Sequence, residues 1–420
     1  MNFLLKDGIV YTDGKLVKSN LWIIDGKVCF LKPSSSIEVQ TIDCNNMFIF
    51  PGFVDVHTHL REPGFSYKET IKSGTMAGAY SGYSALFTMP NLKPVPDSLE
   101  NLKIQQDIID KDAVISVYPF ASITKGQMGQ ELSQMQRMKD KVKGFSDDGK
   151  GVQNPQMMEK AMLIAKECDK IIVAHCEDES LLNGGYIHDG EYAKIHNHKG
   201  ISSASEFKQV ERDVALAKKV GVKYHVCHVS AKESVEIIRK AKQSGTNVTA
   251  ETAPHYLVLN DMMIKESGDF KMNPPIRSEQ DRLALIEGIN DGTIEILATD
   301  HAPHSREEKN NGLKSFNGVV GLETAFPVIY TYLVKTGQIT LEKAIEIMSV
   351  NPAKRFEIDV DIRQGGVANL TIFDLNYKYK IVGENFISMG KSTPFNGMEV
   401  FGKCMANFHN GKLLFNRIEK

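Results

Sequence analysis

Hydrophobic and polar positions follow two different patterns along this chain. In the middle, short apolar runs that are typical of strands alternate with amphipathic segments, such as 98–111 and 154–169, whose apolar residues recur at helical spacing. The apolar runs are residues 53–60, 83–90, 113–120, 142–149, 171–177, 224–230, 247–254 and 296–304. Alternating strand and helix units predict a parallel sheet, and eight of them predict a closed (β/α)₈ barrel.

The two ends of the chain follow the second pattern. Residues 3–52 and 365–415 hold short segments that alternate apolar and polar residues, separated by Asp-Gly and Asn-Gly turn signals. Neither end is large enough to fold alone. We therefore expect an α/β protein in which residues 1–52 and 366–420 form one small β-sandwich of antiparallel strands, with a barrel of residues 53–365 inserted between them.

Composition narrows the class of function. The 420 residues are 42% apolar and 24% charged, which is typical of a globular protein, and a net charge of −2 gives no reason to expect nucleic acid or an anionic membrane as a partner. No apolar run approaches the ~20 residues of a membrane helix, and no signal peptide is visible. Cys176 and Cys227 lie in apolar runs, where packing is the simplest role. The chain is expected to be a cytoplasmic enzyme that acts on a small molecule.

Histidines stand at the ends of three apolar runs. His57 and His59 are two residues apart, so on a strand their imidazoles point to the same face. His175 and His228 end the fifth and sixth runs. Either of the latter two alone is more often a core or rim histidine, but the carboxyl ends of barrel strands meet at one face. The four imidazoles together therefore predict a metal site.

Two further runs end in carboxylates. Asp147 and Asp148 adjoin and would point to opposite faces of a continuing strand, so one can bridge two cations while the other begins a turn; these residues alone leave open which does which. Asp300 closes an apolar run, where an ionised carboxylate is costly without a cationic partner. A metal would supply that partner, and the carboxylate could then act as a general base. The set predicts a two-metal hydrolytic site.

Polar residues after other runs suggest how a substrate is held. Arg61, Asn91 and Asn273 follow the first, second and seventh runs, and His304 is the last residue of the eighth, beyond the expected end of its strand. A guanidinium pairs with a carboxylate in a bidentate fork, so this group indicates recognition of a substrate carboxylate. The alternative is a surface arginine with two turn asparagines. The polar segment 305–318 is a candidate lid, or only a solvated loop.

The motifs HTHLREPG, FTMPN, FSDDG, AHCE, CHVS, KMNPP and ATDHAPH occur in this order. They closely resemble those of the bacterial-type (class I) dihydroorotases of the amidohydrolase superfamily, over nearly the whole chain. The resemblance implies a (β/α)₈ barrel that holds zinc, expected to be two Zn²⁺ ions per chain. It also implies the reversible conversion of N-carbamoyl-L-aspartate to (S)-dihydroorotate and water in pyrimidine biosynthesis.

The same resemblance assigns individual residues. It favours Asp148 over Asp147 and makes Asp300 the proton shuttle for a hydroxide that bridges the metals. The implied metal ligands are His57, His59, Asp148, His175, His228 and Asp300. The implied substrate-binding residues are Arg61, Asn91, Asn273, His304, Asn317 and Gly318. One departure concerns the late loop, where this chain reads Phe316-Asn317-Gly318 and many family members have Phe-Gly.

Two other classes stay open. Hydantoinases, dihydropyrimidinases and allantoinases are similar to this chain more loosely, and they use a carboxylated lysine on strand four, near which Lys141 and Lys143 lie. A catalytically inactive homologue that serves a transcarbamoylase would lack metal ligands, and none is missing here. A homodimer and an association with a transcarbamoylase are compatible with the resemblance.

Overall fold

Eight short parallel strands follow one another in cyclic order in the middle of the chain. The structure, a computed structural model, describes residues 1–33 and 37–418. Parallel bridges Ala121–Phe145 and Thr58–His301 connect a three-stranded and a five-stranded ladder at both of their edges. The strands are β6 (Phe53–Thr58), β7 (Tyr83–Thr88), β8 (Ser116–Pro119), β9 (Gly144–Phe145), β10 (Ile171–Ala174), β13 (Lys223–Val226), β14 (Val248–Thr252) and β15 (Ile296–Leu297).

The expected α/β class is confirmed, and each of the eight apolar runs overlaps one of these strands. Two strands are much shorter than the runs that predicted them, because β9 and β15 hold two residues each. Asp148 and Asp300 therefore lie in the loops beyond the strands, and Asp300 has a left-handed φ of 48°. The strand ends before Asp147 and Asp148, so the condition under which they would point to opposite faces of a strand is not met.

Helices separate the strands and pack against them. They are α1 (Ile71–Tyr80), α2 (Leu99–Asp112), α3 (Met135–Met138), α4 (Pro155–Glu167), α5 (Glu191–Ile195), α6 (Ala204–Val220), α7 (Lys232–Gln243), α8 (Pro254–Val258), α9 (Glu279–Asn290), α10 (Ala325–Ile329), α11 (Leu341–Ile345) and α12 (Asn351–Phe356). After β10 the chain makes a small ladder of β11 (Ile187–His188) and β12 (Gly200–Ile201). No helix in residues 1–33 or 37–418 is both long and apolar enough to cross a membrane.

Strands β6 and β7 are buried along their whole length, as expected of strands covered on both faces. One cluster of buried side chains joins them to α12: the ring of Phe87 lies 5.4 Å from that of Phe120 and 4.8 Å from that of Phe356. Apolar side chains thus fill the space beneath the polar strand ends. The polar side chains are therefore found at the carboxyl ends of the strands.

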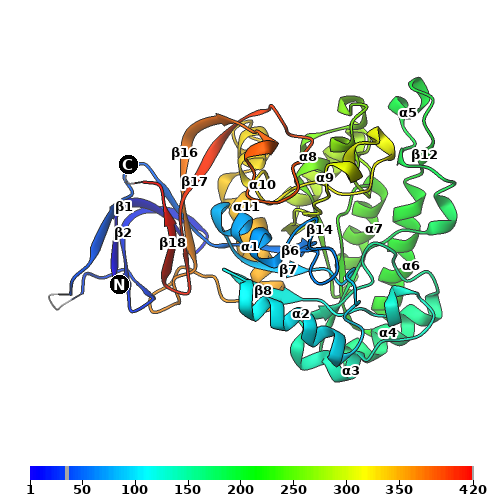
Figure 1. The fold of residues 1–420 in the computed structure, drawn as a ribbon, viewed down its shortest axis with the longest axis horizontal. Helices are drawn as coiled ribbons and strands as arrows, with labels where there is room; N and C mark the ends of the chain where they lie inside the picture. Colours follow the sequence, from blue (N-terminus) through cyan, green and yellow to red (C-terminus); the bar gives the residue numbers. More distant parts are fainter. Residues whose placement is uncertain (34–36, 419–420) are drawn as a thin grey trace.

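Both ends of the chain enter one sheet, which Figure 1 shows in blue and red beside the central strands. Its order is β18-β17-β16-β5-β1-β2-β3, with β4 paired to β1. Its strands are β1 (Phe3–Thr12), β2 (Lys15–Ile24), β3 (Lys27–Cys29), β4 (Gln40–Asp43), β5 (Phe48–Pro51), β16 (Leu370–Lys380), β17 (Glu399–His409) and β18 (Lys412–Asn416). The expectation of antiparallel strands throughout was wrong, because β1 pairs in parallel with β4 and β5. Period-two patterning fixes the buried face of a strand but not its direction.

Aromatic side chains join the terminal sheet to the central strands. Phe53 of β6 lies 5.3 Å from Phe326 of α10 and 5.5 Å from Phe373 of β16, measured between ring centroids. The segment between β16 and β17, residues 381–398, leaves the sheet and reaches the loop after β15. There the backbone N–H of Val320 donates to the carbonyl of Ser392. The terminal sheet therefore contributes one wall near the strand ends.

Candidate active site

Asp148 lies at the centre of a buried cluster at the carboxyl ends of the strands. Its Oδ1 is 3.4 Å from His57 Nε2, 3.7 Å from His175 Nδ1 and 3.6 Å from His228 Nε2. Its Oδ2 is 3.6 Å from His59 Nε2. One carboxylate thus faces four imidazoles that come from three different strand ends.

Asp300 completes the cluster on the side of β6. Its Oδ1 lies 3.1 Å from His59 Nε2 and 3.5 Å from His57 Nε2. On the opposite side, His175 Nδ1 and His228 Nε2 approach to 2.9 Å. The structure therefore brings together all six residues that the resemblance implied as ligands, in two groups that share Asp148.

The donor set fits divalent metal. His57 Nε2 and Asp148 Oδ1 are buried and have no hydrogen-bond partner among the described residues. Buried polar atoms of this kind are rare in folded proteins, and a bound ion would satisfy both of them. Imidazole nitrogen and carboxylate oxygen are zinc-compatible ligands. Groups of potential ligands here include His57, His59 and Asp300, and also His57, Asp148 and His228.

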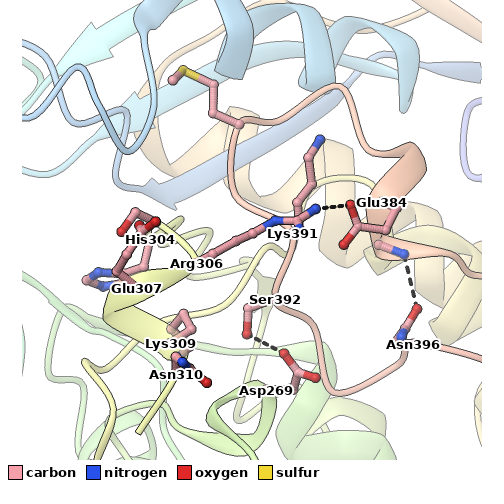
Figure 2. A pocket seen from close by; sticks show the side chains of 13 residues that line it. Asp269, His304, Arg306, Glu307, Lys309, Asn310, Glu384, Lys391, Ser392 and Asn396 are labelled. Carbon is pink, nitrogen blue, oxygen red and sulfur yellow. Dashed lines mark hydrogen bonds and ion pairs between the residues drawn. The ribbon is translucent and has the colours of Figure 1, made fainter.

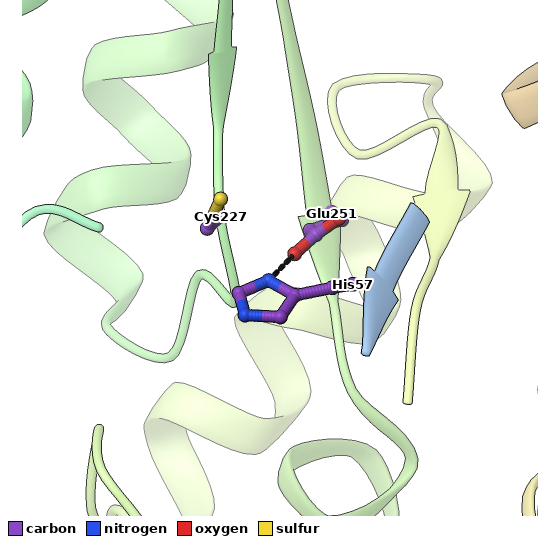
Figure 3. A group of neighbouring side chains, drawn as sticks. All are labelled: His57, Cys227 and Glu251. Carbon is purple, nitrogen blue, oxygen red and sulfur yellow. Dashed lines mark hydrogen bonds and ion pairs between the residues drawn. The ribbon is translucent and has the colours of Figure 1, made fainter. Parts of the chain in front are cut away.

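Glu251 holds His57 in its orientation, although no sequence motif pointed to it. Its Oε1 lies 2.6 Å from His57 Nδ1 (Figure 3). Its Oε2 lies 3.0 Å from His225 Nε2. A carboxylate at Nδ1 fixes the proton there and turns Nε2 toward Asp148. Cys227 is the third member of this group. Burial raises the pKa of its thiol well above the ordinary value, so it packs as a neutral side chain.

Glu177 has the corresponding position beside His175. Its Oε2 is 3.5 Å from His175 Nε2, and both of its oxygens accept from Asn273 Nδ2 at 3.1 Å. The amide oxygen of Asn273 is buried and has no partner within the described residues. Asn273 also lines the central cavity. It can therefore accept a hydrogen bond from an N–H group of a bound substrate.

Asp147 and Asp148 have separate surroundings. Asp147 Oδ1 accepts from the backbone N–H of Ile123 at 2.8 Å and of Thr124 at 3.1 Å, which ties two loops together. Asp148 faces the imidazoles instead. The ammonium of Lys143 donates to the carbonyl of Glu357, away from the cluster. A carboxylated Lys143 is thereby disfavoured as the bridging group.

The imidazoles keep the central carboxyl groups ionised. Burial alone would raise the pKa of Asp148, but the facing His57 and His228 hold it well below its ordinary value. The pKa of Asp300 is also lowered, because His57 and His59 outweigh its burial. Both carboxylates are therefore available as ligands at neutral pH.

A cavity of about 310 Å³ opens above the cluster and has a cationic wall. Arg61 lines it, is 7% exposed, and has a left-handed φ of 63°. Its Nε donates to the carbonyl of Pro303 at 3.1 Å, and Nη2 lies 3.2 Å from His304 Nε2. No carboxylate in the described part of the chain forms an ion pair with Arg61. Burial lowers the pKa of Arg61 to about 10, so it stays charged at neutral pH.

Two other expected substrate residues face the same cavity. Asn91 Oδ1 accepts from His59 Nδ1 at 2.9 Å, which leaves its NH₂ group for the cavity it lines. The ring of His304 stacks on that of Phe316 at 5.6 Å. Burial, followed by the charge of Arg61, lowers the pKa of His304 to about 3. Asn317 and Gly318 also line the cavity.

Lys68 is a further cation of this wall, and no sequence motif pointed to it. Its Nζ lies 2.8 Å from Glu308 Oε1 and 3.4 Å from His304 Nδ1. Glu308 Oε2 lies 2.9 Å from His304 Nδ1. Since Glu308 neutralises Lys68, the charge of Arg61 is left for a bound anion.

A second cavity of about 380 Å³ lies on the far side of His304, between the loop 304–310 and the segment that follows β16 (Figure 2). An ion pair between Arg306 and Glu384 crosses it. Ser392 Oγ donates to Asp269 Oδ1 at 2.6 Å. His304 thus lines both cavities, one on each side of its ring.

Comparisons with known proteins agree with this arrangement. The family model "Dihydro-orotase-like" matches residues 46–234. A dihydroorotase from Staphylococcus aureus (strain MRSA252) is 45% identical over 98% of this chain and 99% of its own length. One from Shouchella clausii (strain KSM-K16) is 46% identical over 97% of this chain and 96% of its own length. The chain belongs to the dihydroorotase family. It is a metal-dependent hydrolase, and its function is that of a dihydroorotase.

Solved structures of related hydrolases share the fold. An L-hydantoinase (dihydropyrimidinase) from Arthrobacter aurescens superposes with a TM-score of 0.89 at 25% identity, covering 99% of this chain and 96% of the other. A dihydropyrimidinase from Brevibacillus agri NCHU1002 gives 0.86 at 22% identity, covering all of this chain and 96% of the other. The dihydroorotase family is thus matched at much higher identity than the hydantoinase fold relatives.

Proposed function

We propose that this dihydroorotase interconverts N-carbamoyl-L-aspartate and (S)-dihydroorotate, as the class I enzymes do. One observation carries the proposal: the unpaired, buried charge of Arg61 lines the same 310 Å³ cavity as Asp148 and Asp300. A substrate for this cavity needs a carboxylate at one end and a hydrolysable group at the other. Dihydroorotate has both, in a carboxylate and a ring amide.

We infer that the cavity holds two zinc ions. His57, His59 and Asp300 would hold one, His175 and His228 would hold the other, and Asp148 would serve both. Bound zinc would polarise the scissile carbonyl and lower the pKa of water from ~15.7 to ~7, which provides a nucleophile at neutral pH. Glu251 and Glu177 keep the imidazoles turned toward Asp148.

Asp300 is the proposed proton carrier. It lies at the boundary between the ligand cluster and the substrate cavity, which it lines. Its Oδ1 is close to His59 and His57. In the hydrolytic direction Asp300 accepts the proton of the attacking water and passes it to the leaving ring nitrogen, and the reverse transfer serves ring closure.

Arg61, Asn91 and His304 orient the substrate. The free edge of the Arg61 guanidinium and the NH₂ group of Asn91 bind its carboxylate, which fixes the ring against the ligand cluster. The unpaired oxygen of Asn273 accepts from a ring N–H. Asn317 and Gly318 close the cavity on the remaining side.

A hydantoinase-type activity is the alternative, because the L-hydantoinase from Arthrobacter aurescens shares the fold. Dihydrouracil separates the two, since it has the ring and amide of dihydroorotate without the carboxylate. A site built to bind a group that is missing can discriminate by ~10⁴–10⁵ in kcat/KM. We expect turnover of dihydroorotate and almost none of dihydrouracil, hydantoin or allantoin. Comparable kcat/KM on dihydroorotate and dihydrouracil would reject the carboxylate pocket.

Metal content tests the proposed metal ligands, which lie at the opposite end of the cavity from Arg61. Elemental analysis after gentle purification should find about two zinc ions per chain, as expected for open sites with nitrogen and oxygen ligands. Chelators should abolish activity, and added zinc should restore it. Full activity in protein free of transition metals would reject the ligand assignment.

The proposal extends to architecture and assembly. The cyclic strand order supports a closed (β/α)₈ barrel of residues 53–365, with residues 1–52 and 366–420 as a composite β domain. A homodimer and an association with a transcarbamoylase are further parts of the proposal. Sedimentation of the purified protein, alone and mixed with a transcarbamoylase, measures both.

A further inference from the structure

The ammonium group of Lys309 uses all of its donors on backbone carbonyls. Lys309 Nζ lies 3.0 Å from the oxygen of Lys271, 2.8 Å from that of Phe316 and 2.7 Å from that of Gly318. An ammonium has three N–H groups and no acceptor, so these contacts satisfy it completely. Lys309 therefore joins the loop after β14 to the loop after β15.

The segment Phe316-Asn317-Gly318, which departs from the family pattern, has carbonyl groups with different partners. Those of Phe316 and Gly318 point toward Lys309, whereas that of Asn317 lies 2.8 Å from His304 Nε2. Lys309 therefore holds the carbonyls on either side of Asn317, while the Asn317 carbonyl contacts His304.

Gly318 shows how closely this segment approaches the site. It has a φ of 134°, and a Cβ there would lie 2.4 Å from the carbonyl oxygen of Ala302. Its N–H donates to the carbonyl of Lys271 at 3.0 Å. The ring of His304, on which Phe316 stacks, lines both cavities, so packing holds it on fewer sides. Lys309 adds a polar constraint at this place.

We propose that Lys309 is a positioning residue that fixes segment 316–318 as a wall of the substrate cavity and, through the Asn317 carbonyl, holds the ring of His304 beside Arg61. This inference rests on the proposed binding of the substrate carboxylate by Arg61. It gives the departing segment of this chain a defined place in the site. Lys309 itself does not line the substrate cavity.

The surroundings of Lys309 give the contact a pH dependence. Burial lowers the pKa of Lys309 to about 7, opposed by the charges of Asp269 and Glu308 and assisted by those of Lys271 and Arg61. Below pH 7 the ammonium donates to all three carbonyls. Above it, neutral Lys309 keeps two N–H groups, so one carbonyl loses its donor.

The test compares Lys309→Met and Lys309→Arg with the unchanged enzyme, and Lys314→Met serves as the control. Lys314 is an exposed lysine of the same loop. Lys309→Met should raise KM for dihydroorotate by about 10-fold to 100-fold, the usual value of one or two hydrogen bonds from a charged donor. It should change kcat much less and leave metal content unaltered. Deuterium uptake in residues 310–318 should increase in Lys309→Met and not in Lys314→Met.

Lys309→Arg adds a readout that a purely structural contact would not change. In the unchanged enzyme KM should rise above pH 7, and in Lys309→Arg this alkaline rise should disappear because the guanidinium stays charged. At pH 7 its KM should stay within about threefold of the unchanged enzyme, a difference well below the loss of one charged hydrogen bond. If Lys309→Met does not fold, the Arg variant decides alone.

Three outcomes would overturn the proposal: an unchanged KM in folded Lys309→Met, equal effects of Lys309→Met and Lys314→Met, or an alkaline rise that persists in Lys309→Arg. None of these affects the proposed function, which fails only if the unchanged enzyme does not act on dihydroorotate. In that event deuterium uptake still tests whether Lys309 holds the segment.

Discussion

The two ends of the catalytic cavity are built in different ways. At the end proposed to bind metal, the side chains lie at or just beyond the carboxyl ends of the strands, and buried carboxylates such as Glu251 and Glu177 hold the imidazoles. At the end proposed to bind the substrate carboxylate, His304 comes from a loop and contacts other loop residues, Glu308 and Asn317. Arg61, also beyond its strand, has a buried charge with no carboxylate partner in the described chain.

This difference suggests that the strand ends carry the reaction and that the loops select the substrate. A sheet fixes the positions of strand ends to within small shifts, and shared metals need that precision. Loops can vary while the sheet stays the same, so they are where substrate preference is set. The hydantoinase fold relatives fit this division, because they share the overall fold with this chain at about 25% identity or less.

The largest effect should come from the boundary between the two ends. Asp300→Asn keeps the size of the side chain but removes its basicity. Activity in both directions should fall by the ~10²–10⁴ usual for a general acid–base group, and by more if metal is lost. Steady-state rates with metal content measured on the same samples check this. Near-native turnover with full metal would show that another group carries the proton.

A smaller effect is expected at the carboxylate end alone. Arg61→Met removes the buried charge and should reduce kcat/KM for dihydroorotate by about 10²–10³, as expected for loss of one partner of a buried charge pair. The rate on dihydrouracil should change little, so the gap between the two substrates narrows. If both substrates lose activity equally, Arg61 serves the fold or the metals rather than the carboxylate.

The smallest effect is expected at Glu251, which supports the proposed metal ligand His57. Glu251→Gln leaves the ligands in place but weakens the hold on His57 Nδ1, so metal affinity should fall by about 10–100-fold. Competition with a chelator measures it. Glu295→Gln is the matched control, because Glu295 pairs with Lys242 outside the cavity. Unaltered affinity in Glu251→Gln would mean that the strand alone orients His57.

The sequence predicted that the proposed metal ligands come together, and it did so for a physical reason. His57, His175 and Asp300 end apolar runs, and a polar residue at that point of a parallel strand projects from a known face. The sequence did not predict the contact of Glu251 with His57, because Glu251 lies inside a strand, where position alone does not show which groups a residue contacts. An ionisable residue within a buried strand was the available signal.

The carboxylate end was harder to predict because its contacts join distant loops. Lys68 pairs with Glu308, which follows the last strand, and no local pattern connects them. Arg61 could be interpreted as a surface residue until the structure showed it buried. The parallel pairing of β1 with β4 and β5 was missed for a similar reason, since alternation does not give strand direction.

The shared terminal sheet has a consequence for the order of events during synthesis. Strand β5 pairs with β16, and Thr12 donates to the carbonyl of Ile362, 350 residues further along the chain. A ribosome that adds roughly 5–20 residues per second leaves β5 with an unpaired edge for tens of seconds while the catalytic region emerges. Such an edge can pair with another nascent chain. Chaperone contact with the first 50 residues should therefore last until translation is nearly complete.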